Sequence, residues 1–234
     1  IEDHYTLLTD YEGNSLRTFY IDKKGYIWFG TIDGIYIFDP TDGKLSHYKH
    51  SRTDPFSLPN NSIWEISEDR QSNVWIGTYS GTLCYVNIDE NNAFKTYHPQ
   101  NSGLNHTPVS AFAEDQQYLW VGTEGGGINR MNKATGEFSY ITSANSITSN
   151  NIKSLITDAG HNLWISTFMG GLDLYNVGRQ KVTNFKHTKG APHSLLVNDV
   201  RKTILEGDSG MWVAYQYQKA EVSYFSFREE SFTH

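Results

Sequence analysis

One sequence pattern recurs five times along this chain of 234 residues, and it constrains the fold more than any other feature. Five of the six tryptophans, at positions 28, 75, 120, 164 and 212, follow one another at steps of 47, 45, 44 and 48 residues. The segments around them are related: IWFGTIDGIYIF, VWIGTYSGTLCYV, LWVGTEGGGINRM, LWISTFMGGLDLY and MWVAYQYQKAEVSYF. Self-similarity at a period of 40–50 residues, roughly, indicates a repeat architecture.

Each repeat has the composition of four short strands joined by turns. Strand a resembles IWEISE, strand b VWIGT, strand c GLDLYN and strand d FKTYH, and Gly, Asp, Asn and Pro separate them. No segment shows a sustained helical period, so the sequence predicts an all-β chain of antiparallel, four-stranded β-propeller blades. Residues 1–10 are predicted to be a strand d left from a preceding blade. The five blades are expected at residues 11–57, 58–103, 104–146, 147–194 and 195–234.

The repeated positions have structural explanations. The tryptophan is expected to pack between neighbouring sheets, and the small residue two positions later leaves room for it. A glycine six positions after the tryptophan permits a positive φ or a close approach where strand b turns into strand c. An acidic residue between strands a and b is expected to accept hydrogen bonds from its own turn, which explains the recurrence better than acid–base catalysis does. The acidic positions are Asp22, Asp69, Asp115, Asp158 and Glu206.

The stretch LWVGTEGGGINR, residues 119–130, allows two interpretations. Consecutive glycines could expose backbone N–H groups to a phosphate, but such a cradle needs a helix to follow it. The residues that follow, INRMNKATGEFSY, have the pattern of a strand, a turn and a strand. The sequence therefore favours a hairpin between strands b and c, with Gly126 as part of the frame.

Composition narrows the function classes. The net charge is −7 and no basic stripe occurs, which excludes a nucleic-acid surface. Cys84 is the single cysteine, so no disulfide forms within the chain. No run approaches the roughly 18 apolar residues of a membrane span. Neither a cofactor nor a metal site is expected, because the nine histidines are scattered without ligand spacing.

Segments such as SLPNNSIWEISEDRQSNVWIGTYSGTL and LWVGTEGGGINRMNKATGEFSY resemble the two-component regulator propeller repeat. The resemblance covers residues 11–234, approximately. It implies the periplasmic sensor region of a Bacteroides-type hybrid two-component sensor histidine kinase. Because blades of that family usually occur in seven-bladed propellers, the five repeats are expected to be a fragment of a larger, seven-bladed propeller. A propeller closed by these five blades alone is the alternative. The implied ligand is an oligosaccharide from a glycan, and the implied partners are the remaining blades and domains of the same protein and a second protomer in a homodimer. Contact with the membrane would come only through the parent protein.

The turn between strands b and c varies from copy to copy while the frame is kept, which places diversity on one face. In a propeller this face also carries the longer connections between blades, rich in His, Asn, Ser and Pro. Aromatic rings there stack on sugar rings, and polar groups fix orientation. The candidate ligand-binding residues are Tyr79, Glu124, Phe168, Met169, Tyr215 and Tyr217. Taken singly, each is also explained as a solvent-facing turn residue.

Two further functions stay open at this stage. A propeller lyase or hydrolase acting on a polysaccharide would need a histidine with acid–base partners near the channel. A protein-interaction scaffold would use a rim or face of the propeller. The sequence contains no nucleophile elbow and favours a sensor over an enzyme. Trp64, outside the repeated column, is expected either to narrow the channel or to pack in the core.

Overall fold

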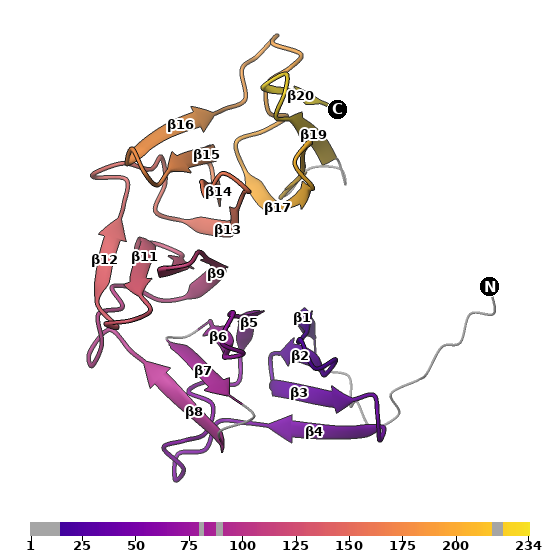
Figure 1. The fold of residues 1–234 in the computed structure, drawn as a ribbon, viewed down its shortest axis with the longest axis vertical. Helices are drawn as coiled ribbons and strands as arrows, with labels where there is room; N and C mark the ends of the chain where they lie inside the picture. Colours follow the sequence, from indigo (N-terminus) through magenta and orange to yellow (C-terminus); the bar gives the residue numbers. More distant parts are fainter. Residues whose placement is uncertain (1–14, 80–81, 88–90, 217–221) are drawn as a thin grey trace, which may run out of the picture. The chain divides into compact units, whose positions relative to one another are not determined.

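The computed structural model describes residues 15–79, 82–87, 91–216 and 222–234. These residues form twenty β-strands in five four-stranded sheets, and they contain no helix (Figure 1). Strands adjacent in the chain are adjacent in each sheet, so every sheet is a meander. The predicted all-β class and the four-stranded repeat are confirmed. The strand expected at residues 1–10 lies outside the described residues. No helix in the described ranges is of a kind that could span a bilayer.

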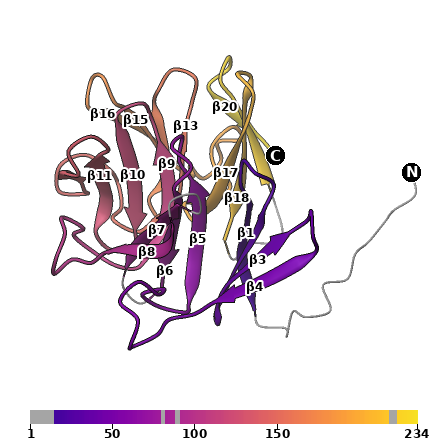
Figure 2. The same ribbon diagram turned by 60° about the horizontal axis from the view of Figure 1, so that its bottom comes forward.

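The chain divides into two compact units. The first is built around two sheets: β1 (Leu16–Ile21), β2 (Ile27–Thr31), β3 (Gly34–Asp39) and β4 (Lys44–Tyr48), then β5 (Ile63–Glu68), β6 (Val74–Thr78), β7 (Leu83–Asn87) and β8 (Asn91–Tyr97). The second is built around three: β9 (Val109–Glu114), β10 (Tyr118–Thr123), β11 (Gly127–Asn132) and β12 (Phe138–Ile141); β13 (Ile152–Thr157), β14 (Leu163–Thr167), β15 (Gly171–Asn176) and β16 (Lys181–Phe185); β17 (Val200–Glu206), β18 (Gly210–Tyr215), β19 (Val222–Ser226) and β20 (Ser231–Thr233). In Figure 2 the strands of each sheet run side by side.

The core of each unit lies between successive sheets. In the first unit, Trp28 packs with Ile63 and Ile76 of the following sheet. In the second, Trp120 packs with Ile152 and Ile165, and Trp164 packs with other buried residues of the last two sheets. Trp28, Trp75, Trp120 and Trp164 are at most 4% exposed. The predicted wedge is confirmed for Trp28, Trp120 and Trp164, which pack with residues of a neighbouring sheet. Trp212, in the fifth, is 44% exposed.

A carboxylate anchors each of these four buried tryptophans. Asp22, Asp69, Asp115 and Asp158 each accept a bond from the indole N–H, at 2.8–3.0 Å. The other carboxylate oxygen accepts backbone N–H groups of the a–b turn; Asp69, for example, holds Gln71 and Asn73 at 2.9 Å. The predicted turn bond is confirmed, and the bond to the indole adds a link between turn and core. Glu206 stands at this position in the fifth copy.

The three consecutive glycines of the third sheet form a hairpin. Thr123 pairs with Gly127 across β10 and β11. The backbone N–H groups of Gly125 and Gly127 both donate to the carbonyl of Asn150 at 3.0 Å, so they are occupied by the next connection. The hairpin interpretation is confirmed. Positive φ angles fall on Gly125 (+118°) and Gly127 (+72°) and not on Gly126, where a Cβ would instead overlap His106 at 2.3 Å.

Candidate functional site

The b–c turns of the second unit are tied to the residues that precede each strand a. Glu124 donates its N–H to the carbonyl of Pro108 and bridges to Asn151 of the next sheet. Phe168 donates to Asn151, and Gln216 donates to Asp199 at 3.1 Å. These backbone bonds fix the b–c turns relative to the starts of β9, β13 and β17. The side chains on the face formed by these turns, the b–c face, are therefore attached to a rigid backbone.

A β-bulge recurs at the start of every strand a. In the fourth sheet Ile152 pairs with Thr167 and Ser154 with Ser166, which leaves Lys153 as the extra residue. The same register shift occurs in the other four sheets. A bulge redirects the side chain of its extra residue, and bulges are frequent beside functional sites. The bulge residues are Arg17, Trp64, Ser110, Lys153 and Arg201.

The bulge at Lys153 joins two of the predicted site residues. The ammonium of Lys153 is ion-paired with the carboxylate of Glu124. It also lies 5.4 Å from the ring centroid of Phe168, a cation–π distance. The Lys153 and Glu124 side chains are only 11% and 22% exposed, so the pair is shielded from solvent. The b–c turns of the third and fourth sheets, which carry Glu124 and Phe168, therefore both approach the ammonium of Lys153 on β13.

Two polar side chains of the fifth sheet lie at the matching strand ends, Asp199 directly before β17 and Gln216 directly after β18. Oδ1 of Asp199 and Oε1 of Gln216 are buried and have no hydrogen-bond donor within the described part of the chain. Burial raises the pKa of Asp199, and the positive charges of Lys153 and Arg201 act in the opposite direction. Buried acceptors are rarely left unpaired. We define the Lys153 cluster as Glu124, Lys153, Phe168, Asp199 and Gln216.

Tyr79, Met169 and Tyr215 do not join this cluster. Met169 is 71% exposed with φ +58°, and Tyr79 is 50% exposed. The hydroxyl of Tyr215 bonds Ser223 at 2.8 Å and accepts the N–H of Leu196 at 3.4 Å, so Tyr215 serves the packing of its own sheet. Tyr217 lies outside the described residues.

Sequence reasoning missed Lys153 and Asp199. Lys153 directly follows Ile152, and Asp199 directly precedes Val200; Ile152 and Val200 are the first residues of β13 and β17. An alignment of the repeats on their tryptophans also brings Ile152 and Val200 to the same position. Comparing the residue that follows this first apolar residue in all five repeats would have shown a basic residue at three of the five bulges. The expectation for Trp64 also changes: it is half-buried, and the guanidinium of Arg17 lies 5.2 Å from its ring centroid.

The histidines mainly hold loops in place. His50 and His187 occupy matching positions, and each donates an Nδ1–H to a carbonyl eight residues later, Leu58 or Leu195, at 2.7 Å. The ring of His47 stacks on Tyr36, with centroids 3.8 Å apart. No group of three or more metal-ligating side chains occurs in the described ranges. Burial raises the pKa of the Cys84 thiol far above its usual value.

Five repeated four-stranded meanders, four of them with a buried tryptophan, define a β-propeller segment. Two crystal structures from B. thetaiotaomicron, both extracellular domains of candidate hybrid two-component systems, share this fold. One superposes with a TM-score of 0.80 at 20% identity, covering 98% of this chain and 30% of its own. The other gives 0.76 at 24% identity, covering 97% and 28%. PorZ, a surface component of the type-IX secretion system of Porphyromonas gingivalis, gives 0.67 at 13% identity over 91% and 33%.

Three of the repeats are similar in sequence to the two-component regulator propeller. That family model matches residues 10–33, 57–80 and 103–125, which confirms the resemblance in the first three repeats. Histidine kinase P4 from Formosa agariphila is 27% identical over 201 residues, which are 79% of this chain. The chain spans 14% of that relative's length.

Proposed function

We propose that this chain is the ligand-sensing segment of a hybrid two-component system, located in the periplasm, and that it recognises a glycan-derived oligosaccharide. The family of the repeats and the extracellular location of the two B. thetaiotaomicron domains support the sensor role. Ligand binding would favour one arrangement of propellers or protomers, and that bias would pass to a cytoplasmic kinase.

The observation that carries the site assignment is the pair of unpartnered acceptors in the Lys153 cluster. Sugar hydroxyls donate hydrogen bonds, and Asp199 Oδ1 and Gln216 Oε1 are acceptors without donors among the described residues. The cluster lies on the face that combines variable b–c turns with long connections, where a rigid frame holds a few polar groups. Lys153 and Glu124 would orient the ligand, and Phe168 would offer an apolar ring face.

The test is a titration of the protein against a panel of neutral and acidic oligosaccharides by isothermal calorimetry, with product analysis in parallel. The Glu124→Gln/Lys153→Met double variant should bind the oligosaccharide at least about tenfold more weakly than the parent protein does. The matched control is Glu114→Gln/Lys133→Met. That pair is similarly shielded, with side chains 18% and 14% exposed, but it lies at the opposite strand ends of the third sheet.

Binding that the control retains and the double variant loses supports the proposal. An equal loss of affinity in both double variants, or no binding to any oligosaccharide of the panel, contradicts it. Cleavage of the oligosaccharide that disappears on a His→Ala substitution would establish a lyase or hydrolase instead. Specific capture of another protein, with no sugar bound, would establish an interaction scaffold.

A further inference from the structure

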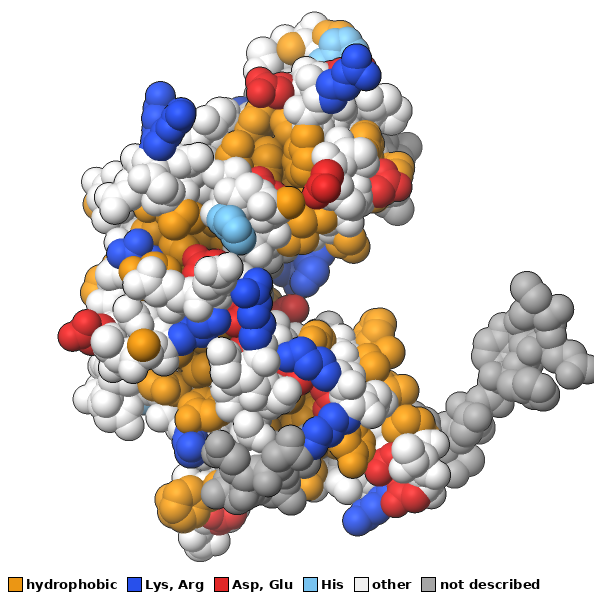
Figure 3. Space-filling model, viewed as in Figure 1, with side chains coloured by type: hydrophobic (Ala, Val, Ile, Leu, Met, Phe, Trp, Pro, Cys, Tyr) orange, Lys and Arg blue, Asp and Glu red, His pale blue; other side chains and the backbone are white. Residues whose placement is uncertain are grey.

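A second cavity lies on the other face of the second unit, where the a–b and c–d turns emerge. It has a volume of about 440 Å³ and is formed between the sheets β13–β16 and β17–β20. Its walls include Trp164, Phe185, Phe225 and Phe227, and the carboxylates of Asp208 and Glu230 stand at its rim. In Figure 3 a hydrophobic area with acidic groups beside it is visible over these sheets. The volume falls within the range of small-molecule sites.

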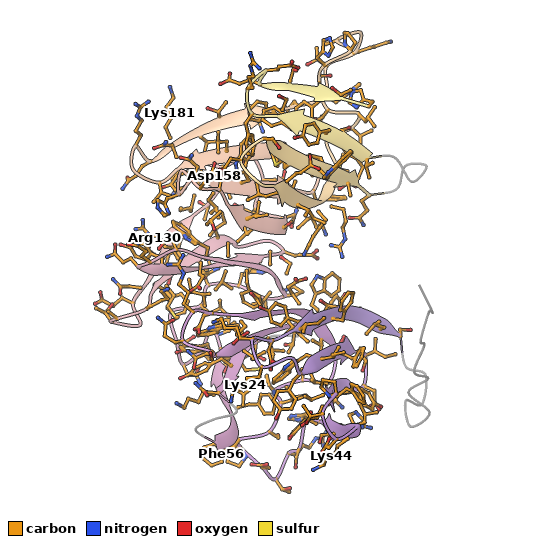
Figure 4. The ribbon with its side chains drawn as sticks, turned by 45° about the vertical axis from the view of Figure 1, so that its right-hand side comes forward. Lys24, Lys44, Phe56, Arg130, Asp158 and Lys181 are labelled. Atoms are coloured by element: carbon orange, nitrogen blue, oxygen red, sulfur yellow. The ribbon has the colours of Figure 1, made fainter. Side chains whose placement is uncertain are left out.

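Comparison with the preceding repeat explains why the cavity is open. In β11 the residue opposite Trp120 is Arg130, and its guanidinium lies 4.6 Å from the ring centroid of Tyr118 and 5.8 Å from that of Trp120. The residue opposite Trp164 in β15 is Leu174, which is shorter and carries no charge. Figure 4 shows Arg130 and Asp158 on neighbouring sheets of this unit.

The turn that follows β13 contributes to the same opening. Ala159 and Gly160 line the cavity, whereas the corresponding turn of the third sheet carries Gln116 and Gln117. The counterpart cavity in the first unit, beside Trp28, measures about 200 Å³ and has Lys44 in its wall. The larger cavity therefore arises from specific side-chain differences and not from the fold alone.

The walls present aromatic faces in nearly parallel planes. The ring of Trp164 lies 5.7 Å from Phe185 at an interplanar angle of 25°, and 5.6 Å from Phe227 at 19°. Aromatic faces carry negative electrostatic potential and attract cations. No Lys or Arg is among the residues that line this cavity, whereas Asp158, Asp208 and Glu230 are. The Asp158 carboxylate is already bonded to the Trp164 indole at 3.0 Å, which leaves Asp208 and Glu230 for a ligand.

From this geometry we infer that the cavity binds an organic cation that has a flat apolar face, such as an amino-sugar ring. The ring packs on Phe185 and Phe227, which are half-buried, while its ammonium is held by Asp208 and Glu230. This site is separate from the Lys153 cluster, because the two lie at opposite ends of the strands. An uncharged ring of the same shape lacks the Coulombic attraction, and an anionic ring is repelled.

The experiment compares the disaccharide of two glucosamine units with its fully N-acetylated counterpart by isothermal calorimetry on the protein. The amine form is expected to bind at least about tenfold more tightly than the acetylated form. Asp208→Asn/Glu230→Gln should weaken binding of the amine by about tenfold, because both carboxylates at the rim are then neutral. Glu229→Gln, a neutral change next to Glu230 but outside the cavity lining, should leave binding within about twofold.

A second variant fills the cavity without touching the carboxylates. Leu174→Arg reproduces the arrangement of Arg130, whose Nε donates to Ser139 Oγ at 2.9 Å; Thr183, opposite Leu174, supplies a similar hydroxyl. It should abolish binding of the amine while circular dichroism and thermal unfolding stay unchanged. Glu124→Gln/Lys153→Met should leave this binding intact, so failure here and failure of the oligosaccharide proposal are distinguishable. Equal affinity for amine and acetylated forms, no binding of the amine, or full binding by Asp208→Asn/Glu230→Gln would overturn the inference.

Discussion

Replacing Lys153 by Met removes the cation from a shielded ion pair and leaves the Glu124 carboxylate without its partner. Glu124 is 22% exposed, so water compensates only in part. Removing one member of a buried pair costs about 3–5 kcal/mol, and partial exposure places the expected loss near the lower end, at about 3 kcal/mol. For a chain of this size that corresponds to a fall in Tm of roughly 6–12 °C.

The double variant Glu124→Gln/Lys153→Met should recover most of this loss, because neither a bare carboxylate nor a bare ammonium remains. We expect a coupling free energy of about 1–3 kcal/mol between the two positions. The assay is urea unfolding of the parent protein, both single variants and the double variant, followed by far-ultraviolet circular dichroism. The Glu114→Gln/Lys133→Met pair provides a reference of similar exposure.

Additive losses in the two single variants would refute this reasoning. They would mean that Lys153 and Glu124 act independently and that the charged contact contributes nothing measurable, as in many exposed pairs. A single-variant loss below about 1 kcal/mol would lead to the same conclusion.

Three further predictions concern the packing of the second unit. Burial raises the pKa of Asp173 above its unfolded value, so the folded state binds this proton more readily. The free energy of unfolding should therefore rise as the pH falls through the raised pKa, and Asp173→Asn should remove this pH dependence in urea titrations at a series of pH values. Asp158→Ala leaves the Trp164 indole N–H buried without an acceptor and should lower stability by about 2–4 kcal/mol in urea unfolding, whereas a loss below about 1 kcal/mol would show that the bond is dispensable. Gly171→Ala places a Cβ 2.3 Å from the Phe185 carbonyl and should cost clearly more than Gly136→Ala, which has a similar φ but open space and should cost about 1 kcal/mol; equal Tm shifts would contradict this.

The sequence determined the repeated frame because each of its signals is local or periodic. Tryptophans about 45 residues apart specify where a large ring recurs, and the alternation of apolar residues specifies which strand face is buried. An aspartate before a turn predicts a bond to its own backbone, and that bond is present. Fold class, strand number per repeat and the hairpin at Gly125–Gly127 all follow from such short-range features.

The sequence was less informative about which turn residues come together. It predicted Glu124 and Phe168 as ligand-binding residues of two different b–c turns, and it did not single out Lys153, which lies on a strand a. Tyr215 has the same aromatic character as Phe168 in the sequence, yet its hydroxyl is bonded within its own sheet. Such differences depend on rotamers and on backbone register, neither of which leaves a pattern in one chain.

Tertiary structure alone brought together the residues of the two proposed sites. The Lys153 cluster exists because a bulge redirects one side chain towards a neighbouring turn, and a bulge changes residue pairing without changing composition. The aromatic cavity lies where Leu174, and not an arginine, stands opposite Trp164, a difference from the preceding sheet that appears only when residues paired across the strands are compared. Local periodicity specifies the blades, whereas packing between residues distant in the chain specifies what the faces of those blades can bind.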